Sequence, residues 1–120
     1  MARILLADDE AAARDLMKRA LVGDGHHVVE AQDGQEALDL VSADPAAFDL
    51  VISDVQMPVL DGIAMVEQAL ASSPHLKAIV MSGFAAGLTS AARLPPARVR
   101  VLTKPVPLDA LKAAVAAALG

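Results

Sequence analysis

The 120-residue sequence contains no cysteine, tryptophan or tyrosine, and only two phenylalanines, Phe48 and Phe84. The absence of cysteine excludes disulfides and thiolate metal sites, and it is compatible with a reducing compartment. Because 55% of the residues are nevertheless hydrophobic, the core must be aliphatic and rich in alanine. A chain of this length can bury one substantial core, so we expect residues 1–120 to form a single domain.

Basic residues are also scarce, with 10 Lys and Arg against 15 Asp and Glu and a net charge of −5. Proteins that bind nucleic acid or an anionic membrane surface need a basic face, so neither is an expected partner. No apolar run approaches the ~18–20 residues of a membrane span. A strand pattern begins at Arg3 without the layout of a signal peptide, and we therefore expect a cytoplasmic protein.

Short aliphatic runs alternate with segments of helix length. The runs that we expect to be strands cover 3–7, 27–31, 49–53, 77–81 and 99–103. Apolar residues recur at helical spacing between them, but residues 84–96 contain glycine, threonine and a proline pair and predict only a short or irregular helix. This alternation predicts an α/β domain with mostly parallel, buried strands.

Several residues predict where helices begin. Asp9-Glu10 should open the first helix with acids in its first turn, and Leu16 should belong to its apolar stripe. Asp33 and Glu36 resemble a capping box before the second helix. Asp61 is expected to cap the third helix.

Four of the expected strands each end at one polar residue: Asp8, Asp54, Ser82 or Lys104. Singly, each also fits an ordinary turn or helix cap. Together they should meet, because the carboxyl ends of parallel strands lie along one edge, where open α/β sheets bind their ligands. Carboxylates gathered there, with Asp9 among them, need a cation, and oxygen ligands without His or Cys suit Mg²⁺. Asp54 then fits a nucleophile for a phosphoryl group, with a hydroxyl and an ammonium nearby to stabilise the new charge.

The motifs around these residues are I-L-L-A-D-D-E at 4–10, V-I-S-D-V-Q-M-P-V-L-D-G at 51–62, M-S-G at 81–83 and K-P at 104–105. Over essentially the whole chain they resemble the CheY-like receiver domain of bacterial two-component response regulators. The sequence looks most like receivers of hybrid histidine kinases and related single-domain regulators. The resemblance implies a flavodoxin-like, doubly wound sheet of five parallel strands in the order 2-1-3-4-5, with five helices.

The resemblance also implies a function, that of a signalling switch in a phosphorelay and not of an enzyme. Asp54 would accept phosphate from a histidine kinase or a histidine phosphotransfer protein, and the domain would then bind an unidentified downstream protein differently. Ser82 would be the switch hydroxyl that moves to the phosphate, and Lys104 the counter-charge. The Lys104–Pro105 peptide bond is expected to be cis, since cis bonds occur before proline.

The same resemblance implies a Mg²⁺ cofactor. Asp9, Asp54 and the backbone carbonyl of Gln56 would ligate the ion, and Asp8 would act mainly through water.

One position departs from the family pattern, and two others bear on the lifetime of the phosphorylated state. Many receivers carry an aromatic residue three positions before the lysine, and it rotates inward on phosphorylation. Here Val101 takes that place, so the signal must depend on the Ser82 loop and on residues 84–96. Gln56 and Phe84 occupy positions that flank the hydrolytic water in the family. We hypothesise that Phe84 hinders in-line attack and prolongs the phosphorylated state.

Other functions remain open at this point. A phosphatase with an aspartate nucleophile needs a D-x-D motif and usually a cap domain, whereas Asp8 and Asp9 are adjacent. A flavin-binding carrier needs a phosphate loop and stacking aromatic residues. A pseudo-receiver that binds partners without phosphorylation is possible, although no phosphorylation residue is missing. No output domain follows Gly120, so we do not expect this chain itself to control transcription.

Overall fold

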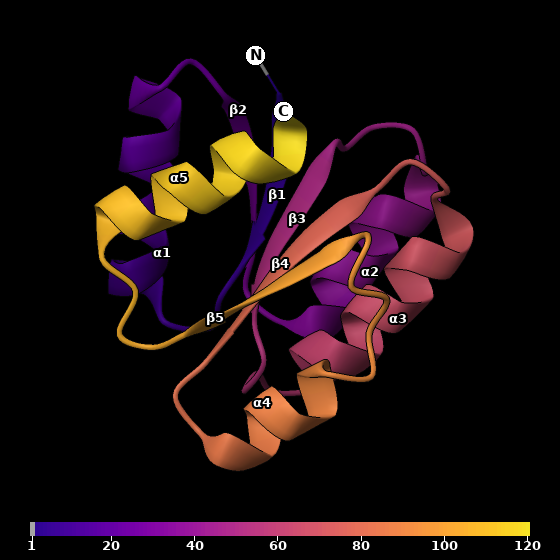
Figure 1. Cartoon of the computed structure of the whole chain (residues 1–120). Coiled ribbons are helices and arrows are strands. Elements are labelled where there is room, and N and C mark those ends of the chain that lie inside the picture. The colour runs from indigo at the N-terminus through magenta and orange to yellow at the C-terminus, as the bar shows by residue number, and fades with distance from the viewer. Residues whose placement is uncertain (1) are drawn as a thin grey trace.

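Five parallel strands form one sheet in the order β2-β1-β3-β4-β5, in a computed structural model that describes residues 2–120. The elements are β1 (Arg3–Ala7), α1 (Ala11–Gly23), β2 (His27–Ala31), α2 (Gly34–Ala43), β3 (Leu50–Asp54), α3 (Gly62–Ser72), β4 (Lys77–Ser82), α4 (Ala85–Ala91), β5 (Val99–Thr103) and α5 (Leu108–Leu119). Helices α1 and α5 cover one face of the sheet, and α2, α3 and α4 cover the other (Figure 1). The predicted fold, strand order and short fourth helix are confirmed.

Alternate residues of each strand supply the two halves of the core, because successive side chains point to opposite faces of a sheet. On β1, Leu5 lies in the cluster beneath α2 and α3, whereas Ile4 and Leu6 lie in the cluster beneath α1 and α5. All three are fully buried. The core is aliphatic, as predicted, and Phe48 is the aromatic residue at its margin.

The capping predictions are confirmed for two helices. Asp33 accepts a hydrogen bond from the Glu36 N–H at 2.8 Å, and Asp61 accepts one from the Ala64 N–H at 2.9 Å. Glu36 reaches back to the N–H of Gln32, one residue before the cap. None of the helices within residues 2–120 has the length and hydropathy of a membrane span.

The prediction for the first helix is wrong in two details. The helix begins at Ala11 and has no acidic residue in its first turn, because Asp9 and Glu10 belong to the connection from β1. Leu16 is 55% exposed. It lies about 140° around the helix from the buried Leu21, and so points away from the sheet.

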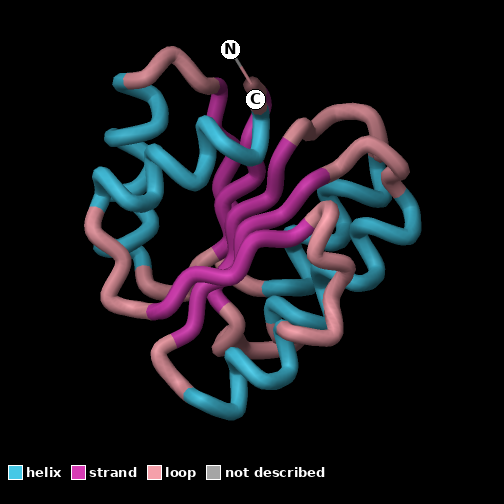
Figure 2. The backbone as a smooth tube through the Cα atoms, viewed as in Figure 1, coloured by secondary structure: helices cyan, strands magenta, loops and turns pink. Residues whose placement is uncertain are grey.

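The strand predictions also need correction. β3 and β4 each reach one residue further than expected, so Asp54 and Ser82 are themselves strand residues. β5 is not a buried strand, because it has a neighbour only on the β4 side, and Val101 is 37% exposed. All the strands run parallel to one another, so their carboxyl ends lie along one edge of the sheet, away from the C-terminus of the chain (Figure 2).

Candidate functional site

The site lies where the chain changes direction across the sheet. β1 and β3 are neighbours, but the chain leaves β1 toward β2 on one side and leaves β3 toward β4 on the other. Such a switch point leaves a crevice beyond the strand ends. Asp8 follows β1 and Asp54 ends β3, so both carboxylates belong to this crevice.

Asp54 is a buried carboxylate held by one lysine. The Asp54 Oδ2 atom lies 2.7 Å from the Lys104 Nζ atom, and the aspartate is only 6% exposed. Lys104 follows β5 and reaches past the intervening strand β4, and its peptide bond to Pro105 is cis, as expected. The Asp54 Oδ1 atom is buried and has no hydrogen-bond partner among residues 2–120.

Asp8 completes a cluster of three acids with Asp9 and Asp54. The Asp8 Oδ1 atom accepts the Glu10 N–H at 2.9 Å, whereas its buried Oδ2 atom has no partner in the described part of the chain. Asp9 is exposed. One carboxylate oxygen from each of the three acids lies within 4.8 Å of the others.

The electrostatics of the cluster oppose its full ionisation. Burial raises the pKa of Asp8 above its ordinary value of 3.8, and the negative charges of Asp54 and Asp9 raise it further. The hydrogen bond from the Glu10 N–H lowers the pKa but does not outweigh them. For Lys104, burial disfavours the ammonium, but the hydrogen bond to Asp54 and the surrounding negative charges outweigh it. They raise the pKa of Lys104 above 10.5. The site thus holds more negative charge than its lysine neutralises.

These residues fit a magnesium ion. The donors are carboxylate oxygens, the hard ligands that Mg²⁺ prefers, and two oxygens of the cluster, Asp8 Oδ2 and Asp54 Oδ1, are buried without a partner among residues 2–120. A buried polar atom without a partner is unfavourable, and a bound cation would relieve it. The contribution of the Gln56 carbonyl stays a prediction.

Ser82 lies at the end of β4 and is fully buried. Its hydroxyl donates to the Gln56 Oε1 atom at 3.2 Å, with the Phe84 carbonyl oxygen at 3.3 Å as the alternative acceptor. It also accepts the Phe84 N–H at 3.1 Å. The structure therefore brings Asp8, Asp9, Asp54 and Lys104 together but turns the Ser82 hydroxyl toward the start of α4.

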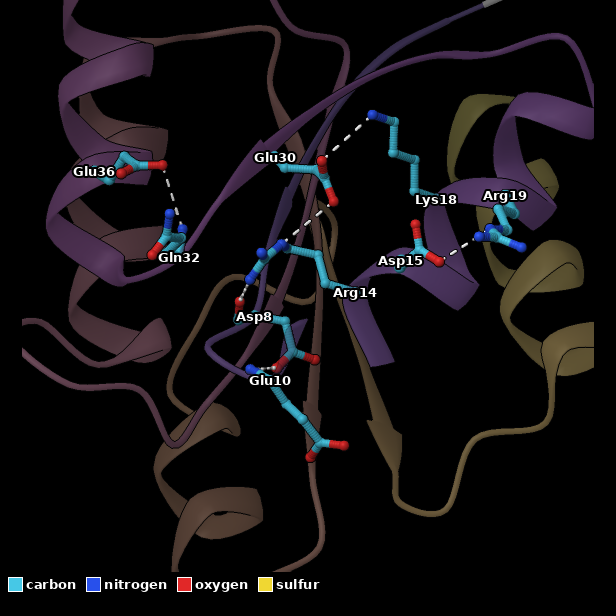
Figure 3. A network of polar contacts seen from close by, with 9 residues as sticks. All are labelled: Asp8, Glu10, Arg14, Asp15, Lys18, Arg19, Glu30, Gln32 and Glu36. Atoms are coloured by element: carbon cyan, nitrogen blue, oxygen red, sulfur yellow. Dashed lines mark hydrogen bonds and ion pairs between the residues drawn. The ribbon is translucent and has the colours of Figure 1, made fainter. Parts of the chain in front are cut away.

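A second set of residues, which the sequence analysis missed, anchors the Asp8 backbone (Figure 3). Arg14 on α1 donates from Nη1 to the Asp8 carbonyl oxygen at 2.6 Å. Its Nε atom lies 3.3 Å from Glu30 on β2, and Lys18 pairs with the other oxygen of Glu30 at 3.3 Å. Nothing in the local sequence indicates these contacts, because they require β1, α1 and β2 to pack side by side.

Comparison with known proteins agrees with this geometry. The response regulator receiver domain family matches residues 4–116. The chain belongs to this family. The response regulator receiver protein CpdR of Brucella abortus is 35% identical to it over 105 residues, which cover 88% of this receiver and 86% of CpdR. The response regulator MprA of Mycolicibacterium vanbaalenii is 37% identical over 98% of this receiver, which spans only 50% of MprA.

Solved receiver structures superpose over nearly the whole chain. The receiver domain of the hybrid histidine kinase CckA gives a TM-score of 0.82 at 33% identity, covering 98% of this receiver and 99% of that domain. A receiver domain protein from Clostridium thermocellum gives a TM-score of 0.89 at 29% identity, covering 99% of this receiver and 94% of that protein. The predicted resemblance to response regulator receivers is confirmed, and the chain is a receiver domain of two-component signalling.

Proposed function

We propose that this receiver is a phosphoacceptor switch in a phosphorelay and that Asp54 takes the phosphoryl group. The observation that carries the proposal is the environment of Asp54. Its carboxylate is buried, one oxygen lies 2.7 Å from the Lys104 ammonium, and the other has no partner among residues 2–120. A nucleophile of this kind needs nearby positive charge for the group that it accepts.

The transfer is a substitution at phosphorus. One Asp54 oxygen forms a bond to the phosphorus of a phosphohistidine, while the phosphorus–nitrogen bond breaks. The imidazole nitrogen keeps the electron pair and becomes available for a proton. The aspartyl phosphate gains negative charge at the crevice, where Lys104 is the fixed counter-charge and the Ser82 hydroxyl is the donor that turns toward the phosphate.

Asp9, Asp54 and the Gln56 carbonyl are the residues that we propose for Mg²⁺, with Asp8 acting through water. When bound, the ion neutralises the phosphoryl oxygens. The chain's own contribution is to hold the acids within reach of one another, which the contacts of Asp8 with Glu10 and Arg14 support.

We propose a histidine kinase or a histidine phosphotransfer protein as the donor, and a downstream protein as the phosphorylation-dependent partner. The receiver of the hybrid histidine kinase CckA, which covers 98% of this chain, supports a donor of this class. We further propose that residues 1–120 act as one domain, in the cytoplasm, without turnover of a substrate.

The test is incubation with a small phosphodonor, such as acetyl phosphate, and Mg²⁺, followed by intact mass spectrometry. Wild type should gain one phosphoryl unit, Asp54→Asn should gain none, and Asp39→Asn, which alters an exposed acid on α2, should behave as wild type. Folded wild-type protein that stays unmodified would contradict the proposal and favour a pseudo-receiver. Catalytic hydrolysis of generic phosphate esters would favour a phosphatase.

A further inference from the structure

The Ser82 hydroxyl lies in a small polar arrangement outside the acid cluster. Its partners are the Gln56 side chain and the backbone of Phe84, which is the residue at the start of α4. A hydroxyl has one proton to donate, so Ser82 cannot keep its bond to Gln56 and also donate to a phosphoryl group on Asp54. Turning toward Asp54 therefore requires Ser82 to release Gln56.

Gly87, on the first turn of α4, closes this arrangement from the other side. A β-carbon at Gly87 would lie 2.3 Å from the Ser82 Oγ atom and 2.9 Å from the Gln56 Nε2 atom. The helix backbone therefore packs directly on both side chains. Only a residue without a side chain leaves room for the Ser82 hydroxyl where it now lies.

We propose that the Gln56 side chain is a latch that holds the Ser82 hydroxyl away from Asp54 in the unphosphorylated receiver. Gln56 is thus a positioning residue that acts through Ser82. This role is separate from the one proposed for its backbone carbonyl. The inference rests on the proposed function, because the latch matters only if a phosphoryl group on Asp54 attracts the Ser82 hydroxyl away from Gln56.

The latch also connects the phosphorylation site to α4. This helix has only seven residues, and its N-cap residue Phe84 makes no side-chain capping hydrogen bond. Ser82 instead accepts the Phe84 N–H at 3.1 Å. When the hydroxyl leaves, α4 loses this contact at its start and the packing beneath Gly87. Many receivers signal through an aromatic ring that rotates inward at the position of Val101. This receiver can change its α4 surface without such a ring.

Release of the latch is sterically possible because Gln56 is exposed. Its side chain lines a groove of about 680 Å³ that also includes Pro58, Asp61, Gly87 and Arg93. An amide that leaves Ser82 can enter this groove and bond to water. The lost hydrogen bond is then replaced, so the latch is worth about as much as one net hydrogen bond.

The test uses beryllofluoride with Mg²⁺, a stable mimic of the phosphoryl group, on the full chain. Gln56→Met keeps the length of the side chain but replaces its amide oxygen with a thioether sulfur, which is only a weak acceptor. We expect it to tighten beryllofluoride binding about three- to tenfold in calorimetry, the range of one net hydrogen bond. In a Ser82→Ala background the same Gln56→Met change should have no effect, since there is no hydroxyl to release.

Gly87→Ala is the second variant, because its methyl group would displace the hydroxyl directly. It should also tighten binding and shift the Ser82 and Phe84 amide resonances toward their beryllofluoride-bound positions. Ser90→Ala is its matched control, since it also raises the helix propensity of α4 at an exposed position. It should change neither readout.

The outcomes separate the latch from the proposed function. If wild type does not bind beryllofluoride with Mg²⁺, the proposed function fails and the latch fails with it. If wild type binds but Gln56→Met leaves the affinity unchanged, or tightens it equally without the Ser82 hydroxyl, the latch alone is overturned.

Discussion

At the scale of single residues, the acid cluster stands out because its buried carboxylate oxygens accept few hydrogen bonds. Asp8 Oδ2 and Asp54 Oδ1 are both buried without a hydrogen bond from the described residues. Each such atom costs about 1–3 kcal/mol, and more when it is charged. The fold tolerates this cost at the place where a bound cation would be a partner for these oxygens.

The raised pKa of Asp8 predicts that its charge destabilises the metal-free protein. A raised value means that the folded state binds the proton more tightly than the unfolded chain does. The stability that the folded state gains from binding this proton is complete at a pH below 3.8, the ordinary pKa of the group. It is lost as pH rises through the folded-state pKa. Above the folded-state pKa of Asp8, the cost of burying its charged carboxylate remains.

We therefore expect Asp8→Asn to increase the free energy of unfolding at neutral pH in EDTA, because the variant removes the buried charge. Thermal denaturation between pH 3.5 and about 7 measures this, and the advantage over wild type should grow with pH. Asp39→Asn, on the exposed side of α2, should show no such growth. A variant less stable than wild type at pH 7 would contradict the interpretation.

Phe84 offers a second test at a single position. Its side chain is 64% exposed, and its backbone contacts Ser82, the proposed switch hydroxyl. If the ring hinders water at the phosphoryl group, Phe84→Ala should hydrolyse the aspartyl phosphate about three- to tenfold faster, a barrier change of about 0.7–1.4 kcal/mol. The loss of phosphorylated mass after removal of the donor gives the rate. Phe84→Leu should stay near wild type, and an unchanged rate in Phe84→Ala would refute the hypothesis.

At the scale of elements, glycine lets α3 approach the end of β3 that carries Asp54. A β-carbon at Gly62 would lie 2.1 Å from the Asp54 carbonyl oxygen and 2.8 Å from the Ser53 Oγ atom. The carbonyl oxygen belongs to the backbone of a central strand, so it cannot move aside without displacing the site. The close packing of α3 on β3 and the position of Asp54 therefore depend on the same glycine.

Gly62→Ala should reduce the free energy of unfolding by about 1–3 kcal/mol and slow phosphorylation of Asp54. An added β-carbon at Gly23, in the last turn of α1, would meet no atom of residues 2–120 within 4 Å apart from its chain neighbours and the backbone of its own helix. Gly23→Ala is thus the matched control and should be neutral or slightly stabilising. Equal melting temperatures for the two variants would show that the contact at Gly62 relaxes easily.

At the scale of the whole molecule, a net charge of −5 and a cluster of three acids predict a response to divalent cations. A ligand that binds only the folded state adds about 1.4 kcal/mol at ten times its dissociation constant. For a domain of this size we expect Mg²⁺ to raise the melting temperature by about 3–6 °C. NaCl at equal ionic strength controls for general screening of the charge. If Mg²⁺ adds nothing beyond NaCl, the metal assignment is wrong.

The local features of the molecule could be predicted from the sequence because they depend on neighbours along the chain. The aliphatic runs specify the strands, Asp33 and Asp61 cap the helices that follow them, and residues 84–96 favour only a short helix. The motifs around Asp54 and Lys104 also indicated the family and the carboxyl edge where the site lies.

The sequence by itself thus determined the order of the elements, the family and the edge of the sheet at which the acids gather. The tertiary structure decided which of them touch: it left Leu16 and Val101 exposed, joined Arg14 to the Asp8 backbone, and turned Ser82 toward Gln56. These outcomes depend on packing between elements far apart in the chain, and no local pattern encodes which rotamer a hydroxyl adopts between two possible partners.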